Sequence, residues 1–165
     1  MGPSIGAVSS LVVILTLTGC SGGNPMGSEV SRTVSTTEAR QSVKDIVDRS
    51  AEAVDGDWQV YSGPAVQQCT KGTGGDGAAY TYIKAWEGPS GDPAHDIAVV
   101  KKLWEREGIT TGPFNSGGSD PILGVRGVGG PTTSISFLAA VHRYTITAVS
   151  ECADGNALEM RENDE

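Results

Sequence analysis

The residues of this sequence that could take part in the most kinds of chemistry are its three cysteines, Cys20, Cys69 and Cys152. A thiol can be acylated, can pair in a disulfide, can bind a metal or can act as a nucleophile. Structural metal sites bring cysteines and histidines close together in sequence, yet neither CxxC nor HxxxH spacing occurs here. The sequence therefore predicts no metal site and no cofactor, and it favours acylation or disulfide formation.

The two histidines, His95 and His142, are the candidate bases for hydrolytic chemistry. A nucleophilic serine needs a base and a third group that orients the base. With a histidine as the base, Ser116 or Ser119 would be the nucleophile and Asp120 the orienting group. However, no GxSxG, HExxH or acidic calcium-loop motif is present. Both histidines fall at expected turns or helix ends, where exposed residues are usual. We therefore assign no catalytic residue, and a small hydrolase stays as an alternative.

Cys20 follows a short apolar run in which residues 11–18 read LVVILTLT, and no charged residue precedes Glu29. The run is far shorter than the ~20 residues that a transmembrane helix needs. Its length suits the apolar region of a secretory signal peptide that ends at small residues. Residues 1–19 contain no Lys or Arg, so the terminal amine alone supplies the positive charge usual at the start of such a peptide.

The sequence Leu17-Thr18-Gly19-Cys20 resembles the lipobox of bacterial cell-envelope lipoproteins, and the rest of the chain looks like small uncharacterised actinobacterial lipoproteins. In that family a signal peptidase cuts before the cysteine, whose thiol carries diacylglycerol and whose amine is often acylated, for example with palmitate. The resemblance implies a signal peptide over residues 1–19 and lipidation of Cys20. It implies a domain held on the extracytoplasmic face of the cell membrane, and it implies no catalytic residues.

Export would place Cys69 and Cys152 in a compartment where disulfides persist. A bridge between them would close a loop of more than 80 residues. The chain-entropy treatment gives such a crosslink roughly 4.5 kcal/mol. We predict this disulfide, and two free buried thiols are the alternative.

The formal net charge of −8 is carried entirely by residues after Cys20. Binding to nucleic acid needs clustered Lys and Arg to neutralise phosphates, so this balance argues against a nucleic-acid partner. It also argues against a polybasic contact with anionic lipid. The expected partners are the membrane, through the lipid on Cys20, and an envelope protein or glycan.

The elements that must position these residues begin after a Gly/Ser/Thr-rich stretch, residues 20–35, which we expect to be a flexible tether. Fifteen such residues span roughly 20–25 Å. Ser35 and Glu38 have capping-box spacing and predict the start of a helix that runs to about Val54. A second helix is expected with Asp92 as its N-cap and its end at Gly108.

Two strands are expected between the helices, over residues 58–69, with a bulge at Gly63-Pro64, and over residues 78–88. The KGTGGDG turn between them lacks the order of a phosphate-binding loop. Three more strands follow the second helix, over residues 121–128, 133–140 and 142–152. Residues 110–121 read as a loop, the most plausible place for a binding site, and residues 154–165 as an acidic, disordered tail.

Aromatic residues Tyr80, Tyr82 and Trp86 share one face of the second expected strand. Aromatic stripes usually belong to the core, but the opposite face of this strand also has enough apolar residues to be buried. The three aromatics are therefore both candidate core residues and a candidate binding surface for a glycan or protein.

Together these patterns predict a single α+β domain over residues 36–153, in the order α-β-β-α-β-β-β. Neighbouring strands in sequence imply hairpins, so we expect a two-layer fold with an antiparallel sheet of about five strands and both helices on one face. The function we expect is that of a non-enzymatic, membrane-anchored binding domain of the cell envelope. The alternatives are a small envelope hydrolase and a lipid or small-molecule carrier.

Overall fold

The computed structural model describes residue 2 and residues 33–88 and 91–164. Cys20, the expected signal peptide and most of the expected tether lie outside the described residues. The description below concerns the unit that begins at Ser31.

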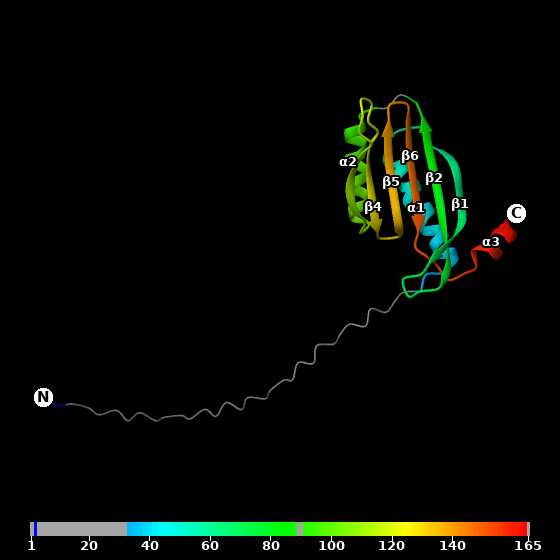
Figure 1. Ribbon diagram of the computed structural model, residues 1–165. Coiled ribbons are helices and arrows are strands. Elements are labelled where there is room, and N and C mark those ends of the chain that lie inside the picture. The colour runs from blue at the N-terminus through cyan, green and yellow to red at the C-terminus, as the bar shows by residue number, and fades with distance from the viewer. Residues whose placement is uncertain (1, 3–32, 89–90, 165) are drawn as a thin grey trace. The chain divides into compact units, whose positions relative to one another are not determined.

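The described chain forms three helices and six strands (Figure 1). The helices are α1 (Thr36–Glu52), α2 (Pro93–Arg106) and α3 (Ala157–Asp164). The strands are β1 (Gln59–Thr70), β2 (Asp76–Glu87), β3 (Thr110–Asn115), β4 (Leu123–Gly129), β5 (Thr132–Ala140) and β6 (Arg143–Ser150). None of the described helices is long and apolar enough to cross a membrane.

The six strands form one sheet in the order β1-β2-β6-β5-β4-β3, and every neighbouring pair is antiparallel. Helices α1 and α2 lie behind the sheet in Figure 1, on the same face. The predicted α+β class, the antiparallel sheet and the placement of both helices on one face are confirmed. The sheet has six strands where about five were expected.

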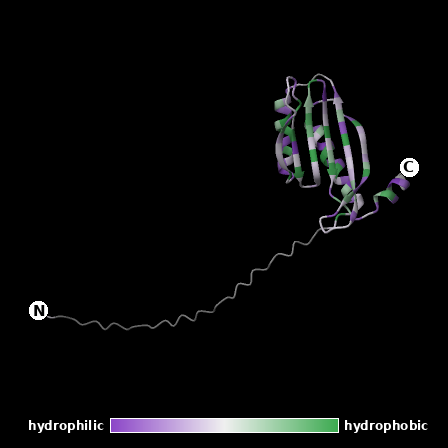
Figure 2. Ribbon diagram, in the orientation of Figure 1, coloured by the Kyte–Doolittle hydropathy of each residue, from purple (hydrophilic) through white to green (hydrophobic). Residues whose placement is uncertain are grey.

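The core lies between this face and the two helices, as alternation along the strands predicts. Figure 2 shows the resulting bands of apolar and polar residues along the strands. Fully buried side chains from both layers meet there, among them Val43, Ile46, Val100, Trp104, Phe137, Tyr144 and Ile146. Exposed charged residues cover the outer sides of α1 and α2, so each helix buries only its apolar stripe.

Side-chain caps fix the starts of α1 and α2. The Ser35 hydroxyl accepts a hydrogen bond from the Glu38 amide at 3.2 Å, as the capping-box spacing predicts. The Asp92 carboxylate accepts from the amides of Ala94 and His95, each at 3.1 Å, and Pro93 occupies the first helical position. Both predicted starts are confirmed.

A buried hydrogen bond joins the two helices. The Trp104 indole donates to the Ser50 hydroxyl at 2.8 Å, and that hydroxyl donates to the Ile46 carbonyl at 2.6 Å. Trp104 and Ser50 are both completely buried, so this contact satisfies polar atoms that water cannot reach. It therefore fixes how α2 packs against α1.

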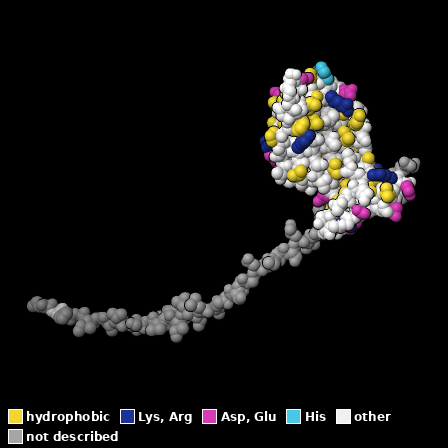
Figure 3. Space-filling view, in the orientation of Figure 1, with side chains coloured by type: hydrophobic (Ala, Val, Ile, Leu, Met, Phe, Trp, Pro, Cys, Tyr) yellow, Lys and Arg dark blue, Asp and Glu magenta, His cyan; other side chains and the backbone are white. Residues whose placement is uncertain are grey.

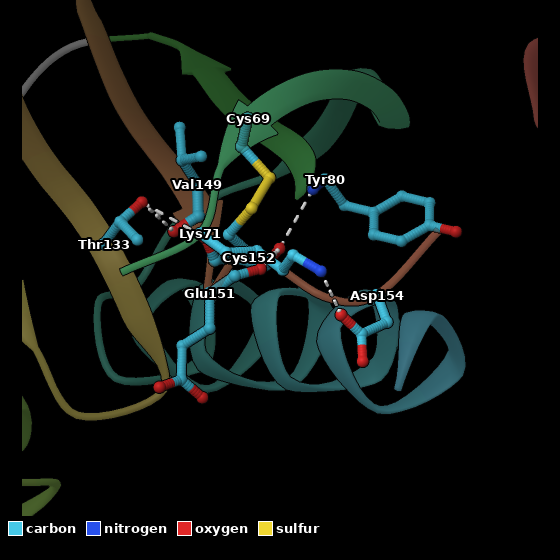
Figure 4. Close-up of a disulfide and its surroundings, with 9 residues drawn as sticks. Cys69, Lys71, Tyr80, Thr133, Val149, Glu151, Cys152 and Asp154 are labelled. Atoms are coloured by element: carbon cyan, nitrogen blue, oxygen red, sulfur yellow. Dashed lines mark hydrogen bonds and ion pairs between the residues drawn. A yellow bond between two sulfur atoms is a disulfide. The ribbon is translucent and has the colours of Figure 1, made fainter. Parts of the chain in front are cut away.

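The predicted Cys69–Cys152 disulfide is present at one end of the sheet (Figure 4), with the two Cα atoms 5.9 Å apart. It lies against Gly77, where a Cβ atom would come within 2.7 Å of the Cys152 sulfur. Only glycine fits at that position. A 2.7 Å ion pair between Lys71 and Asp154 lies beside the disulfide, so two crosslinks hold the chain after β6 to the β1–β2 hairpin.

Strand β3 corrects the prediction that residues 110–121 are a loop. The Gly112-Pro113 pair resembles a turn signal, but β3 lies at the sheet edge, where a proline needs no ladder partner for its missing N–H. Residues 116–121 connect β3 to β4, as a loop should.

Helix α3 corrects the prediction of a disordered tail over residues 154–165. The Asn156 side chain accepts hydrogen bonds from the amides of Leu158 and Glu159, which caps the helix. Ala157 is buried, and the Arg161 guanidinium donates to the Val66 carbonyl in β1 at 3.2 Å. These tertiary contacts order a polar segment whose own hydrophobic pattern is weak.

Candidate binding site on the uncovered face of the sheet

The cross-strand register shows which residues lie on the face of the sheet that is turned away from α1 and α2. Residues directly opposite each other in antiparallel strands share a face. A row of such pairs crosses the sheet from β3 to β2, and it consists of Gly112, Arg126, Ser136, Thr147 and Ile83. We call the face that contains this row the open face.

The open face is almost free of acidic residues, although the chain carries a net charge of −8. From β3 to β2 it comprises Thr110, Gly112, Phe114, Gly124, Arg126, Val128, Ser134, Ser136, Leu138, Ala140, Arg143, Thr145, Thr147, Val149, Thr81, Ile83, Ala85 and Glu87. Its single carboxylate, Glu87, lies at the margin and pairs with Arg143 at 3.7 Å. Figure 3 shows this face as largely uncharged, with separate basic groups on it.

Arg126 is the basic residue at the β3–β4 side of the open face. Its guanidinium carbon lies 3.9 Å from the centre of the Phe114 ring, so the two groups are stacked. Gly112 faces Arg126 in the register and Gly124 faces Phe114, so the arginine reaches diagonally across the strand pair to the ring. No acidic residue in the described part of the chain forms an ion pair with Arg126.

A hollow of about 610 Å³ opens beside Arg126 on the open face. It exists because the neighbouring side chains are small. Its lining includes Gly112, Val128, Ser134, Ser136 and Thr147. The hollow therefore offers one positioned cation together with hydroxyl groups that both donate and accept hydrogen bonds. This arrangement suits the binding of an anionic, polar ligand.

A second group of charges lies on the helix side of the sheet, where Asp48 of α1 meets Lys84 of β2 at 2.9 Å. Lys44 also pairs with Asp48, and the Tyr82 hydroxyl donates to it at 3.4 Å. Burial acts to raise the pKa of Asp48, but the two ammonium groups outweigh it and hold that pKa below its ordinary value. Burial, with the nearby charge of Asp48, raises the pKa of Tyr82.

Asp48→Asn is expected to lower the free energy of unfolding at pH 7 by about 1–3 kcal/mol, because Lys84 would remain half-buried without a carboxylate. The folded-state pKa of Asp48 is depressed, so its contribution is complete above the unfolded-state pKa near 4 and is lost as the pH falls through the folded-state pKa. Urea unfolding from pH 7 to 2.5 should show the wild-type advantage shrinking below about pH 4. A constant difference across this range would contradict the assignment.

The candidate binding surface of Tyr80, Tyr82 and Trp86 is wrong, because these side chains face the helices. Tyr80 and Tyr82 are only 4% and 2% exposed. Trp86 packs edge-on against Tyr144, with ring centres 5.2 Å apart. The alternation along β2 is as expected, but it could not tell which of its two faces α1 covers.

The candidate hydrolytic residues form no hydrogen-bonded set in the described part of the chain. His95 is exposed in the first turn of α2, and His142 is exposed in the turn between β5 and β6. The Ser116 hydroxyl accepts from the Ile122 amide at 2.9 Å and closes the loop that also contains Ser119 and Asp120. In residues 33–88 and 91–164, no hydrogen bond joins either imidazole to these groups. Nor does that part of the chain show a cluster of three potential metal ligands.

Arg126 and Phe114 were not identified from the sequence. The segment PILGVRGV does carry a signal, since Arg126 is the one charged residue in an otherwise apolar, glycine-rich strand. Its partner could not be found, because the β3 pairing that brings Phe114 beside it was not predicted. Thr110 to Pro113, in the segment expected to be a binding loop, do line the hollow.

No protein-family model matches the sequence, and no curated protein matches it. Among solved structures, the fold is similar to the crystal structure of a DUF4853 family protein from Actinomyces odontolyticus. The TM-score is 0.56 at 17% sequence identity, and the match covers 76% of this chain and 71% of that chain. At this identity the similarity supports the fold alone.

Proposed function

We propose that this chain is a lipid-anchored extracytoplasmic protein that acts by binding a component of the cell envelope. The anchor is the lipid on Cys20, as implied by the resemblance of residues 17–20 to a lipobox. The remainder of the expected tether joins that anchor to the domain. The open face is the binding surface.

The observation that carries this proposal is the charge distribution of the sheet. In an acidic chain, the face turned away from α1 and α2 has one carboxylate, at its margin, and presents Arg126, stacked on Phe114, beside a hollow. Surfaces that serve only solubility need no such segregation, because interspersed charges suffice. A positioned cation with no acidic partner is suited to a ligand from outside the chain.

The proposal is one of binding and not of catalysis. The side chains beside the hollow are an arginine, hydroxyl groups and small apolar groups, which hold ligands by hydrogen bonds and charge. His95 lies on α2 and His142 in the β5–β6 turn, and the Ser116 hydroxyl accepts a hydrogen bond from the Ile122 amide of its own loop. A lipid carrier would need an enclosed apolar cavity, whereas this hollow is open and partly lined by hydroxyl groups.

Photo-crosslinking in intact cells tests the binding surface. A photoreactive residue at Ser134, exposed on the open face, is expected to give adducts with an envelope component. The matched control is the same residue at Lys102, exposed on α2, which should give few or none. Equal adducts from both positions, or none from Ser134, would contradict the use of the open face.

A further inference from the structure

We propose that the hollow beside Arg126 binds an anionic carbohydrate, a sugar chain that carries carboxylate groups. This inference rests on the proposed function, because it names the ligand of the open face. Arg126 pairs with the carboxylate, and the hydroxyl groups of Ser134, Ser136 and Thr147 hold the neighbouring sugar hydroxyls.

The charge of the ligand follows from Arg126. The domain carries many carboxylates, yet none in the described part of the chain pairs with this guanidinium. The guanidinium carbon lies 3.9 Å from the centre of the Phe114 ring, a contact that positions the guanidinium without using its N–H groups, which are available to a ligand. An arginine fork matches the two oxygens of a carboxylate, and fixing it beforehand reduces the entropy lost on binding.

The sugar character of the ligand follows from the lining. Ser134, Ser136 and Thr147 contribute hydroxyl groups beside the cation, and each hydroxyl can both donate and accept. Sugar hydroxyls need partners of this kind in close array. An acyl chain would suit the hollow less well, because the Arg126 guanidinium and these hydroxyl groups would lose water without gaining hydrogen-bond partners.

The shape of the hollow agrees with this ligand. At about 610 Å³ and open to solvent, it lies on a sheet face and not inside the core. The row through Arg126 crosses the hollow with Ser136 of β5 and Thr147 of β6, so neighbouring sugar rings would meet these hydroxyl groups in turn. A long ligand could therefore enter and leave without opening the fold.

The test is isothermal titration of the mature lipidated protein in neutral detergent with trigalacturonate, with neutral maltotriose as the matched sugar. Binding of trigalacturonate alone is expected, and it should weaken as salt is added, because the pair is solvent-exposed. Arg126→Gln should reduce the affinity by about tenfold or more. Arg106→Gln, the same change at the exposed end of α2, should leave it unchanged.

A second variant keeps the charge and fills the space. Gly112→Leu should weaken trigalacturonate binding while Arg126 is intact, since a Cβ atom at Gly112 meets nothing within 4 Å and the longer side chain would enter the hollow without disturbing the fold. Thermal melts of each variant at wild-type values exclude misfolding as the cause.

The proposal is overturned if trigalacturonate does not bind, if Arg126→Gln binds it as well as wild type, or if triglutamate binds equally tightly. Equal binding of triglutamate would assign the site to acidic peptides. The photo-crosslinking at Ser134 is a separate experiment, so adducts there without trigalacturonate binding would support the proposed function and reject the carbohydrate ligand. Absence of those adducts would reject both proposals.

Discussion

Cys20→Ala is expected to abolish all incorporation of a labelled fatty acid into this protein. In a lipoprotein the thiol after the lipobox is the acceptor of diacylglycerol, and Leu17-Thr18-Gly19 precedes only this cysteine. Each buried CH₂ contributes ~0.8 kcal/mol, so two or more chains hold a protein stably on a bilayer. The measurement is metabolic labelling with an alkyne fatty acid, followed by in-gel detection.

The matched control is Cys69→Ala/Cys152→Ala, which removes the other two thiols and leaves Cys20 in place. It should be labelled as strongly as wild type per molecule recovered. Label that persists in Cys20→Ala, or a wild-type protein that takes up none, would contradict the lipoprotein assignment.

Removing the disulfide by Cys69→Ala/Cys152→Ala is expected to destabilise the domain by about 2–5 kcal/mol, a fall in Tm of roughly 10–20 °C. The bridge spans 83 residues and ties β1 to the segment after β6. Its loss would free a long loop in the unfolded chain. The Lys71–Asp154 ion pair beside the bridge would remain, but it is partly exposed and contributes little by comparison.

Thermal melts with and without a reductant separate this effect from the cost of the substitutions. Wild type should lose stability when reduced, and the double variant should not respond. An unchanged wild-type Tm under reducing conditions, together with two thiols titratable in the native protein, would show that the bridge does not form.

Local rules account for much of the fold. The Ser35 and Asp92 caps depend on residues within three positions of one another, and the strand alternation that buries Tyr144 and Ile146 is visible over a few residues. The cysteine pair could be predicted too, because the resemblance of residues 17–20 to a lipobox implies a lipid on Cys20 and leaves Cys69 and Cys152 to pair with each other.

What escaped prediction depends on contacts between distant segments. Strand β3 is ordered by its pairing with β4, and α3 by its contacts with β1 and the core in addition to its Asn156 cap, so their own sequences carry weak signals. The stack of Arg126 on Phe114 needs the β3–β4 register, and no local pattern encodes it. For Tyr80 and Tyr82, the alternation along β2 predicts that the two side chains share a face of the sheet. It does not predict that this is the face that the helices cover.

The intact mass of the mature protein isolated from membranes tests the lipid anchor at Cys20. We expect a chain that begins at Cys20, carries diacylglycerol with or without a further acyl group, and lacks the two hydrogens lost when the Cys69–Cys152 bridge forms. A mass for an unmodified chain, for a chain that retains residues 1–19, or for protein released into the medium would contradict it.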